Sequence, residues 1–251
     1  RVQLRPKIPD MSLHLITGGA GFVAVNLARR LLANGQSVLA VDDLSRGRRE
    51  LLVEFERDPR FSFLQVDCSD AGALAAAVES ASQPVTHVWH MAANSDIPAG
   101  IADPTIDRDR TFATTFGVLQ VMRRFGIPAL HFASSSAIYG DFGDQEIHEN
   151  IGPLQPISNY GAMKLASEAQ IRAAVGAFLP RADIFRFPNV IGVPATHGVI
   201  WDFVRKLKAT PQRLEVLGDG TQQKAYLHVD DLVGAMLYIS ELEERYNVFN
   251  I

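Results

Sequence analysis

The chain has 251 residues, of which 47% are hydrophobic and 21% are charged, and its formal net charge is -4. This length and balance suit one large α/β domain or two small ones with a sizeable core. The slightly acidic charge gives no electrostatic basis for binding nucleic acid or an anionic membrane surface. Uninterrupted apolar runs are much shorter than the roughly 20 residues that a membrane-spanning helix requires.

Cys68 is the only cysteine of the chain, which excludes an intrachain disulfide bond and a cysteine metal cluster. A reducing, cytoplasmic compartment is therefore expected. No spacing of histidine, aspartate and glutamate indicates a metal site. His14, His87 and His131 fall on predicted strands and are expected to be packed or sheet-edge residues.

The two ends of the chain differ from the rest. Residues 1–10 carry Arg1, Arg5 and Lys7 with two prolines, which indicates a flexible leader or added residues, with Met11 as the natural first residue. Residues 246–251 resemble the beginning of a strand, so we expect the C-terminal end of the fold to be incomplete.

Short apolar segments alternate with helical patterns along the first three quarters of the chain. Strands separated by helices predict a parallel sheet covered by helices on both faces. Two segments richer in proline and glycine, 141–158 and 187–200, follow the fifth and sixth strands, where ligand-binding loops emerge in such sheets. The expected strands are 13–16, 38–41, 61–66, 85–90, 129–133 and 182–186, and the expected helices are 22–34, 71–80, 111–125 and 160–175.

A glycine-rich turn, Gly18-Gly19-Ala20-Gly21, joins the first predicted strand to the first helix. Gly18 permits a tight turn, and Gly21 lets a pyrophosphate approach the backbone N–H groups at the start of the helix, where the helix dipole favours anions. Ala24 stands where a third glycine is expected, which is a mild change at a helix–strand contact. The turn is typical of a Rossmann-type dinucleotide site, although short glycine motifs also occur by chance.

The second predicted strand ends at Asp42, about 20 residues downstream of the glycine turn, where dinucleotide-binding folds place a ribose-binding acid. A carboxylate there accepts a hydrogen bond from the adenosine 2′-hydroxyl and repels a 2′-phosphate, so the position favours NAD over NADP. Arg46 and Arg48 keep NADP open as an alternative. Asp67, after the third strand, fits an adenine contact and a loop-capping role equally well.

Tyr160 and Lys164 are four residues apart on a predicted helix and therefore share one face. Ionising a tyrosine near neutral pH requires its pKa to fall by about three units. The Lys164 ammonium and the positive nicotinamide ring of NAD would supply opposite charge in a partly desolvated pocket. Ser134-Ser135-Ser136 ends the fifth strand, where a hydroxyl can reach the same substrate oxygen. Each motif alone also fits an ordinary helix or turn, but their order along the chain indicates an oxidoreductase site.

Seven segments occur in a characteristic order: Thr17–Phe22, Val41–Ser45, His90–Ala93, Ser134–Gly140, Pro156–Lys164, Arg186–Gly192 and Tyr226–Asp231. From about residue 12 to its end, the chain resembles the extended short-chain dehydrogenase/reductases, in particular the NAD-dependent nucleotide-sugar epimerases and dehydratases. The resemblance implies a Rossmann-type doubly wound parallel sheet at 11–186, with substrate loops near 94–100 and 141–158. A smaller, mainly substrate-binding region built from interleaved segments is expected at 187–251.

The family pattern implies a role for each matching residue. Tyr160 is the expected base, Lys164 its electrostatic partner and a ligand of the nicotinamide ribose, and Ser135 the hydroxyl that orients the sugar oxygen. Lys224 occupies a position where the family often has an arginine for the diphosphate, and Thr111 one where a buried asparagine is frequent. The predicted cofactor contacts are Gly18, Gly21, Phe22, Val23, Asp42, Asp67, Cys68, Met91, Ala92, Ala93, Tyr160 and Lys164, and the predicted substrate contacts are Ser95, Ser136, Asn189, Val199 and Lys224.

The resemblance leaves several reactions to distinguish. Dehydratases of the family resemble the pattern Thr-Asp-Glu-x-Tyr, and here Ser136 and Ala137 occupy the acid positions. Alanine offers no proton for an elimination, so the expected reaction is NAD-dependent 4-epimerisation of a nucleotide-diphosphate sugar, such as a UDP-hexose or UDP-hexuronate, through a 4-keto intermediate. A nucleotide-sugar reductase or dehydrogenase, a 4,6-dehydratase, and a non-catalytic NAD-binding sensor or scaffold are the alternatives.

Two further expectations concern packing. The helices at 111–125 and 160–175 form the dimer contact in similar proteins, so a homodimer is expected. Trp201, Phe203 and Val204 are expected to pack into the core, while Val199 borders the nucleotide base by resemblance.

Overall fold

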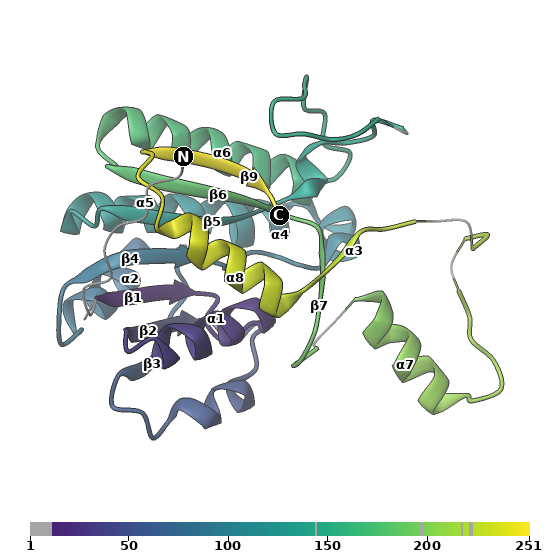
Figure 1. Ribbon diagram of the computed structural model, residues 1–251, viewed down its shortest axis with the longest axis horizontal. Coiled ribbons are helices and arrows are strands. Elements are labelled where there is room, and N and C mark those ends of the chain that lie inside the picture. Colours follow the sequence, from purple (N-terminus) through teal and green to yellow (C-terminus); the bar gives the residue numbers. More distant parts are fainter. Residues whose placement is uncertain (1–11, 144, 196–197, 217, 221–222) are drawn as a thin grey trace.

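The computed structural model describes residues 12–143, 145–195, 198–216, 218–220 and 223–251, so the expected leader at 1–10 and Met11 lie outside the described residues. Within the described part, seven strands form one parallel sheet in the order β3-β2-β1-β4-β5-β6-β9 (Figure 1). The predicted α/β fold is therefore confirmed. The strands of this main sheet are β1 (Leu13–Thr17), β2 (Ser37–Asp42), β3 (Phe61–Gln65), β4 (Val85–His90), β5 (Ala129–Ser135), β6 (Arg181–Phe187) and β9 (Tyr246–Asn250).

The strand order creates the place where a ligand can bind. β1 pairs with β2 on one side and with β4 on the other, so the order reverses between β1 and β4. In parallel sheets, a crevice forms at the carboxyl ends of the strands beside such a reversal. The glycine turn after β1, Asp42 in β2 and Ser135 in β5 all fall at this edge.

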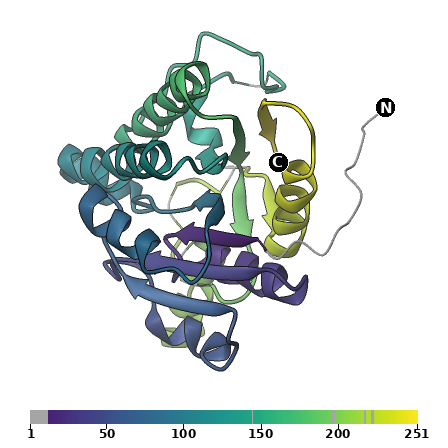
Figure 2. The ribbon, with the colours of Figure 1, turned by 90° about the vertical axis from the view of Figure 1, so that its left-hand side faces the viewer.

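Helices cover both faces of the main sheet, as the end view in Figure 2 shows. One face is covered by α1 (Phe22–Ala33) and α8 (Val229–Ser240), and the other by α2 (Ala71–Glu79), α5 (Ala113–Phe125) and α6 (Asn159–Ala177). Because both faces are covered, burial along the interior strands does not simply alternate from one residue to the next. All five residues of β1 are buried, for example.

The chain between β4 and α5 is more irregular than the sequence predicts. The expected helix at 111–125 is preceded by a π-helical turn, η2 (Arg108–Phe112), and by two short helices, α3 (Ile97–Ala102) and α4 (Pro104–Asp107). Asp96 and Asp103 cap these short helices by accepting hydrogen bonds from Ala99 N and Thr105 N. Two 3₁₀ helices, η1 (Arg49–Phe55) and η3 (Ser136–Ile138), follow β2 and β5.

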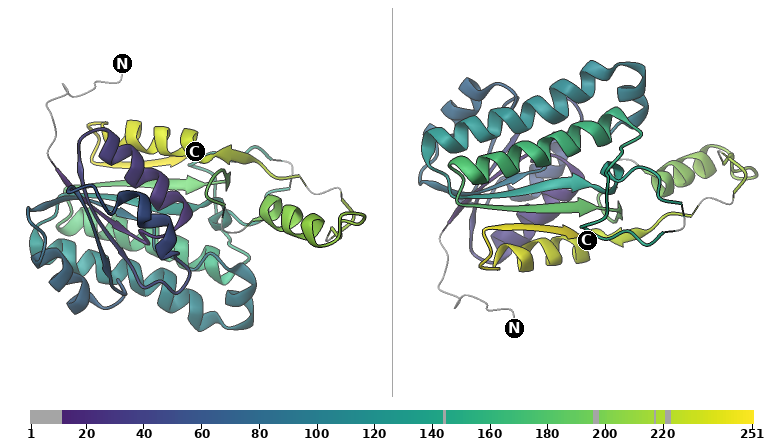
Figure 3. Two further views of the ribbon diagram at one scale, coloured as in Figure 1. Left: turned by 90° about the horizontal axis from the view of Figure 1, so that it is seen from below. Right: turned by 90° about the horizontal axis from the view of Figure 1, so that it is seen from above.

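Residues 188–228, called the arm below, carry the short strands β7 (Asn189–Ile191) and β8 (Tyr226–His228), which pair in parallel, and the helix α7 (Val199–Ala209). Figure 3 shows α7 standing away from the main sheet. No residue of α7 is buried, so the expected core packing of Trp201, Phe203 and Val204 is wrong. The helix is amphipathic in sequence, but the described residues place no element over its apolar side.

After the arm, the chain returns to the main sheet. α8 packs on α1, and β9 adds to the edge of the sheet beside β6. The predicted strand at 246–251 is thus confirmed, and the last part of the segment 187–251 completes the main sheet. Among the described residues, none of the helices combines the length and apolar character needed to cross a membrane.

Candidate active site

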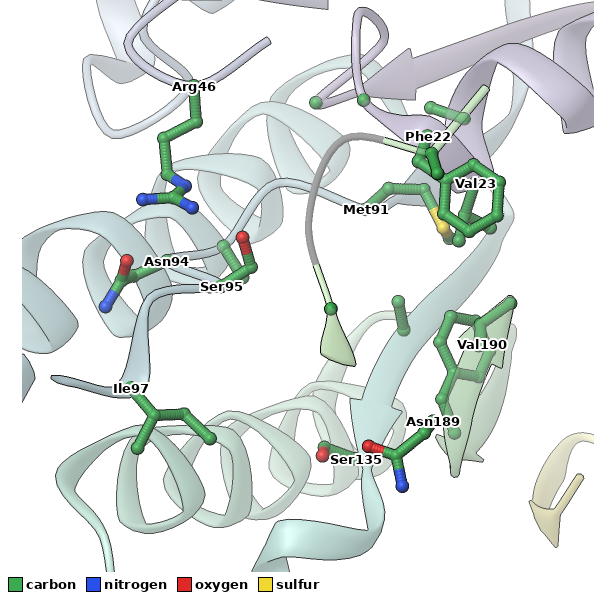
Figure 4. Close-up of a pocket in the computed structure, with 18 of the residues that line it drawn as sticks. Phe22, Val23, Arg46, Met91, Asn94, Ser95, Ile97, Ser135, Asn189 and Val190 are labelled. Carbon is green, nitrogen blue, oxygen red and sulfur yellow. The ribbon is translucent and has the colours of Figure 1, made fainter. Parts of the chain in front are cut away.

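A cavity of about 1580 Å³ opens at the carboxyl edge of the main sheet. The turns after β1, β2 and β3 line one part, and the segment after β4 together with β5 and α6 lines another. The arm supplies the rest of the lining. Figure 4 shows Phe22, Met91, Ser95 and Ser135 arranged around the same open space.

The glycine turn fits a pyrophosphate. Gly18 has a φ of +66°, and a Cβ at this position would lie 2.8 Å from the backbone nitrogen of Ala92. A larger residue would therefore clash with the Ala92 backbone and distort the turn. Gly21 is the N-cap of α1, and no side chain caps that helix. The N–H groups of Phe22 and Val23 therefore stand at the cavity without a side-chain acceptor, at the positive end of a 12-residue helix.

Asp42 is held rigidly at the edge of the same cavity. Its carboxylate accepts hydrogen bonds from Ala20 N at 3.0 Å and from Leu44 N at 2.8 Å. Burial outweighs these bonds and raises the pKa of the Asp42 carboxyl above its usual value. A Cβ at Gly47 would lie 2.5 Å from Asp42 Oδ1, so the loop needs a glycine there to leave room for the acid. A fixed carboxylate fits the ribose hydroxyls of NAD.

The neighbouring cations do not neutralise Asp42. Arg46 Nη1 instead makes a 2.9 Å ion pair with Asp96, which joins the loop after β2 to the loop after β4. Arg48 lines the cavity as well. The arrangement favours a cofactor without a 2′-phosphate, as the sequence predicts.

Asp67 caps its loop, and its adenine contact stays a prediction. The Asp67 carboxylate accepts a 2.8 Å hydrogen bond from Ser69 N, as a loop cap does, and the residue also lines the cavity. Cys68 beside it is buried, and burial raises the pKa of its thiol to about 12. This cysteine is therefore a packing residue that stays protonated.

The reactive side chains come together where β5 meets α6. Ser158 caps α6 by accepting a 3.1 Å hydrogen bond from Gly161 N, which places Tyr160 in the first turn of the helix. The Ser135 hydroxyl, at the end of β5, accepts a 3.2 Å hydrogen bond from Ala137 N and lies close enough to the Tyr160 phenol to lower its pKa. Lys164 Nζ donates a 2.5 Å hydrogen bond to Ala133 O and lies 5.8 Å from the centre of the Tyr160 ring. The structure thus unites the three predicted residues Ser135, Tyr160 and Lys164.

The pKa values of this pair differ from the sequence prediction. Burial raises the pKa of Tyr160 to about 12, the charge of Asp107 raises it further, and the nearby Ser135 hydroxyl lowers it. Burial also lowers the pKa of Lys164 to about 7, against the opposing charge of Glu168. The combined effect of Lys164 and the nicotinamide ring on the phenol stays a prediction, because in this structure the Lys164 ammonium is itself desolvated and bonds to a carbonyl.

A buried polar network lies one helical turn beyond Lys164 on α6, and the sequence analysis did not predict it. Glu168 Oε1 accepts a 2.5 Å hydrogen bond from the Ser134 hydroxyl, and Arg186 donates to both oxygens of the same carboxylate at 3.1 and 2.8 Å. Arg186 Nη1 also donates to Tyr139 Oη at 2.8 Å. The signal was available, since Glu168 lies one helical turn after Lys164 on the same face.

The remaining predicted residues divide clearly. Ser136 is exposed in η3 and is absent from the cavity lining, because β5 ends at Ser135 and the chain turns away. Residues 141–158 also supply none of the described lining. Arg110, Thr114 and Tyr226 line the cavity without having been predicted. The other predicted contacts, all of which line it, are Gly18, Gly21, Phe22, Val23, Asp42, Asp67, Cys68, Met91, Ala92, Ala93, Ser95, Asn189, Val199 and Lys224.

The fold and the glycine-turn site define a Rossmann-type dinucleotide-binding protein. The sequence model of the NAD dependent epimerase/dehydratase family matches residues 14–251. The chain belongs to this family, and NAD is its cofactor.

The two curated relatives compared here are both named as 4-epimerases of a UDP-sugar. The chain is 29% identical over 228 residues to UDP-glucose 4-epimerase of Mycolicibacterium smegmatis, an alignment that covers 89% of this chain and 71% of the relative. It is 28% identical to UDP-glucuronate 4-epimerase of Thermodesulfobacterium geofontis, with 88% and 69% covered.

Solved structures agree in fold. UDP-glucose 4-epimerase of Thermus thermophilus, solved with NAD, has a TM-score of 0.81 at 27% identity and covers 95% of this chain and 77% of its own. dTDP-glucose 4,6-dehydratase of Streptomyces venezuelae, also solved with NAD, has a TM-score of 0.87 at 28% identity, with 95% and 75% covered.

Proposed function

We propose that the protein catalyses the NAD-dependent 4-epimerisation of a nucleotide-diphosphate sugar, with a UDP-hexose or UDP-hexuronate as the substrate class. The observation that carries the proposal is the grouping of Ser135, Tyr160 and Lys164 at one end of the cavity whose other end holds the glycine turn. Relatives named as 4-epimerases of UDP-glucose and UDP-glucuronate support the substrate class.

Residues of this chain would hold the cofactor at both ends. The N–H groups at the start of α1 face the pyrophosphate, Asp42 accepts from the adenosine ribose, and Lys164 donates to the nicotinamide ribose. Bound NAD supplies hydride acceptance and return at the sugar C4, and its positive ring adds a charge near the phenol. That charge acts in the direction opposite to the burial that raises the pKa of Tyr160.

Tyr160 moves the proton. Its phenolate oxygen takes the proton from the sugar 4-hydroxyl as the C4 carbon is oxidised, and the Ser135 hydroxyl holds the same sugar oxygen in line. The 4-keto sugar then turns over within the cavity, hydride returns to the opposite face of C4, and Tyr160 returns the proton to the 4-oxygen. Asn189 and Lys224 of the arm bind the diphosphate, and Ser95 and Val199 contact the sugar nucleotide.

A turnover assay with a panel of nucleotide sugars tests the proposal. Purified protein with NAD is incubated with UDP-, dTDP-, GDP- and CDP-linked sugars, and the products are separated by chromatography. We expect a UDP-sugar and its 4-epimer to interconvert without net change in NADH. Net consumption of NADH or NADPH would identify a reductase instead, and tight NAD binding with no turnover of any sugar would identify a sensor or scaffold.

A 4,6-dehydratase is the second candidate, because the dehydratase structure has the higher TM-score of the two structures described above. The residues after Ser135 disfavour it. Ala137 has no proton to donate, and Ser136 lies outside the cavity lining. Formation of a 4-keto-6-deoxy product in the same assay would show that the protein catalyses elimination and not epimerisation.

We also propose that the chain works as a homodimer in the cytoplasm, with residues 11–186 forming the cofactor half and the arm the main part of the substrate half. α5 and α6 pack side by side on one face of the sheet, and α5 exposes Phe116 there. The lone buried Cys68 suits a reducing compartment. Sedimentation analysis of the purified protein and fractionation of the native host test the two statements.

A further inference from the structure

Asp107, the last residue of α4, is a buried carboxylate that the proposed chemistry does not use. Its side chain is fully inaccessible to solvent, with a relative exposure of 0%. Oδ1 accepts a 2.9 Å hydrogen bond from Asn94 Nδ2. Oδ2 has no hydrogen-bond partner among the described residues. A buried carboxylate oxygen without a donor is costly, so its position needs an explanation.

The second oxygen lies against the backbone of α3. A Cβ built on Gly100 would overlap Asp107 Oδ2, so only a glycine lets α3 approach this carboxylate. The carbonyl oxygen of Gly100 in turn accepts a 2.9 Å hydrogen bond from Asn159 Nδ2, and Asn159 is the residue before Tyr160. A continuous set of contacts therefore runs from Asp107 through Gly100 to the first turn of α6.

The other oxygen holds the cavity wall. Asn94 lines the cavity, and its amide group is fixed on one side by Asp107 and on the other by the backbone of Asp96. Asn94 N also donates a 3.1 Å hydrogen bond to Thr111 Oγ1. Asp107 itself is absent from the cavity lining, so it acts on the site only through its neighbours.

The charge of Asp107 also reaches Tyr160. The charged groups near the phenol in the described structure are Lys164 from α6 and Asp107 from α4, and the uncharged Ser135 hydroxyl lies beside it at the end of β5. Only Asp107 among them is negative. A base must take a proton and then return it, and the Asp107 charge acts in the same direction as burial, which favours the protonated phenol.

We propose that Asp107 is a positioning residue for Tyr160: held between Asn94 and Gly100, its carboxylate fixes α3 against the first turn of α6 and sets a negative charge behind the phenol. The inference rests on the proposed role of Tyr160 as the proton carrier. It assigns a function to a buried acid that does not contact the substrate.

Titration of Tyr160 tests the charge. The holoprotein is titrated by the ultraviolet difference absorbance of tyrosinate, and the same titration of Tyr160→Phe is subtracted to isolate this phenol. Asp107→Asn keeps the shape and removes the charge, so the Tyr160 midpoint should move to lower pH by roughly one unit. Asp109→Asn, an exposed acid two residues away, is the matched control and should leave the midpoint unchanged. An Asp107→Asn midpoint equal to that of the control overturns the proposal.

A pair of substitutions tests the contact. Gly100→Ala inserts a methyl group against Asp107 Oδ2 and should lower kcat at least tenfold with little change in KM. Gly176→Ala is the control and should leave kcat unchanged, because a Cβ added at Gly176 meets no neighbouring atom within 4 Å. Adding Asp107→Ala to Gly100→Ala removes the overlap, so the double variant should be more active than the product of the two single effects predicts. Independent, multiplicative effects would overturn the positioning role.

The two proposals fail separately. The tyrosinate titration needs no turnover, so a shifted midpoint in a protein that epimerises no sugar would refute the proposed function and retain the role of Asp107. If the protein is an active epimerase but Asp107→Asn leaves the Tyr160 titration midpoint unchanged, the proposed function is retained and the role of Asp107 is refuted.

Discussion

Ser134 and Glu168 are joined by a 2.5 Å hydrogen bond between β5 and α6, directly below Lys164. The same carboxylate binds the Arg186 guanidinium, so a buried acid is shared between a hydroxyl and a cation. Glu168 thereby has two effects. It pairs a buried arginine, and its charge opposes the burial that lowers the pKa of Lys164 to about 7.

Glu168→Gln should therefore weaken both stability and activity at neutral pH. Breaking a buried ion pair from one side leaves Arg186 uncompensated, at a cost of about 3–5 kcal/mol in the free energy of unfolding. Urea unfolding measures this change. Glu79→Gln, which breaks the exposed pair with Arg124, is the control and should cost at most about 1 kcal/mol. Equal losses in the two variants would contradict the buried network.

The same variant should shift the pH dependence of turnover. Without the Glu168 charge the pKa of Lys164 falls further, so its ammonium form, present below that pKa, is lost at lower pH. The alkaline loss of kcat should accordingly begin at a lower pH than in the parent protein. A pH profile of kcat checks this. If the alkaline limb of the profile does not move, ionisation of Lys164 does not control kcat.

The two neighbouring serines should differ sharply. Ser135 lines the cavity beside Tyr160, whereas Ser136 is exposed outside it. Ser135→Ala should lower kcat by roughly 10²-fold or more, as expected when a residue that assists proton transfer is removed. Ser136→Ala should stay within about twofold. Tyr160→Phe provides the reference for complete loss of the proton carrier, and a fully active Tyr160→Phe variant would remove the mechanism.

Cofactor choice should depend on Asp42 and on the glycine that leaves it room. Asp42→Asn removes the charge that repels a 2′-phosphate, so the ratio of NAD to NADP affinity should fall by about tenfold, equivalent to roughly 1.4 kcal/mol. Gly47→Ala should weaken NAD binding by displacing the carboxylate. Isothermal titration with both nucleotides measures the effect, and Gly234→Ala, a helical glycine with open space around it, is the control. An unchanged ratio in Asp42→Asn would refute the role.

Acid stability should reveal His90. Its ring is fully buried between Thr17 Oγ1 at 2.7 Å and Thr115 Oγ1 at 3.0 Å, and burial lowers its pKa to about 3. The unfolded chain binds a proton near pH 6.5 while the folded chain does not. The free energy of unfolding should therefore fall as pH drops from about 6.5 toward 3, by at most about 1.4 kcal/mol per pH unit from this one group.

The His90→Gln variant isolates that contribution. It removes the titrating ring and keeps a side chain that can bond to a threonine hydroxyl. Its unfolding free energy, measured by denaturant titration at several pH values, should fall less steeply over this range than that of the parent protein. Identical slopes would show that other groups control the acid response.

The long elements could be predicted from the sequence because their patterns are local. The strands from Leu13 to Phe187 are apolar runs between helices, and the glycine turn marks the step from β1 to α1. Tyr160 and Lys164 share a helix face by spacing alone. These residues therefore fall in one site without any knowledge of long-range packing.

The arm and the pKa of Tyr160 could not be predicted, for a physical reason. β7 and β8 are three residues each and exist only because they pair across more than thirty intervening positions. Trp201 lies on an amphipathic helix, but amphipathicity does not say whether a partner surface is present. The pKa of Tyr160 is raised chiefly by burial and further by Asp107, which lies on a short helix that the sequence pattern did not indicate.

Both ends of the arm are tied to the main sheet, by β6 before it and by α8 and β9 after it. Any displacement of the arm is consequently a rotation about two anchored ends, because neither end can move away unless a strand separates from the sheet. A single proteolytic cut between α7 and β8 would leave both pieces anchored to the main sheet, one through β6 and the other through β9, while it opens a loop that supplies part of the cavity lining.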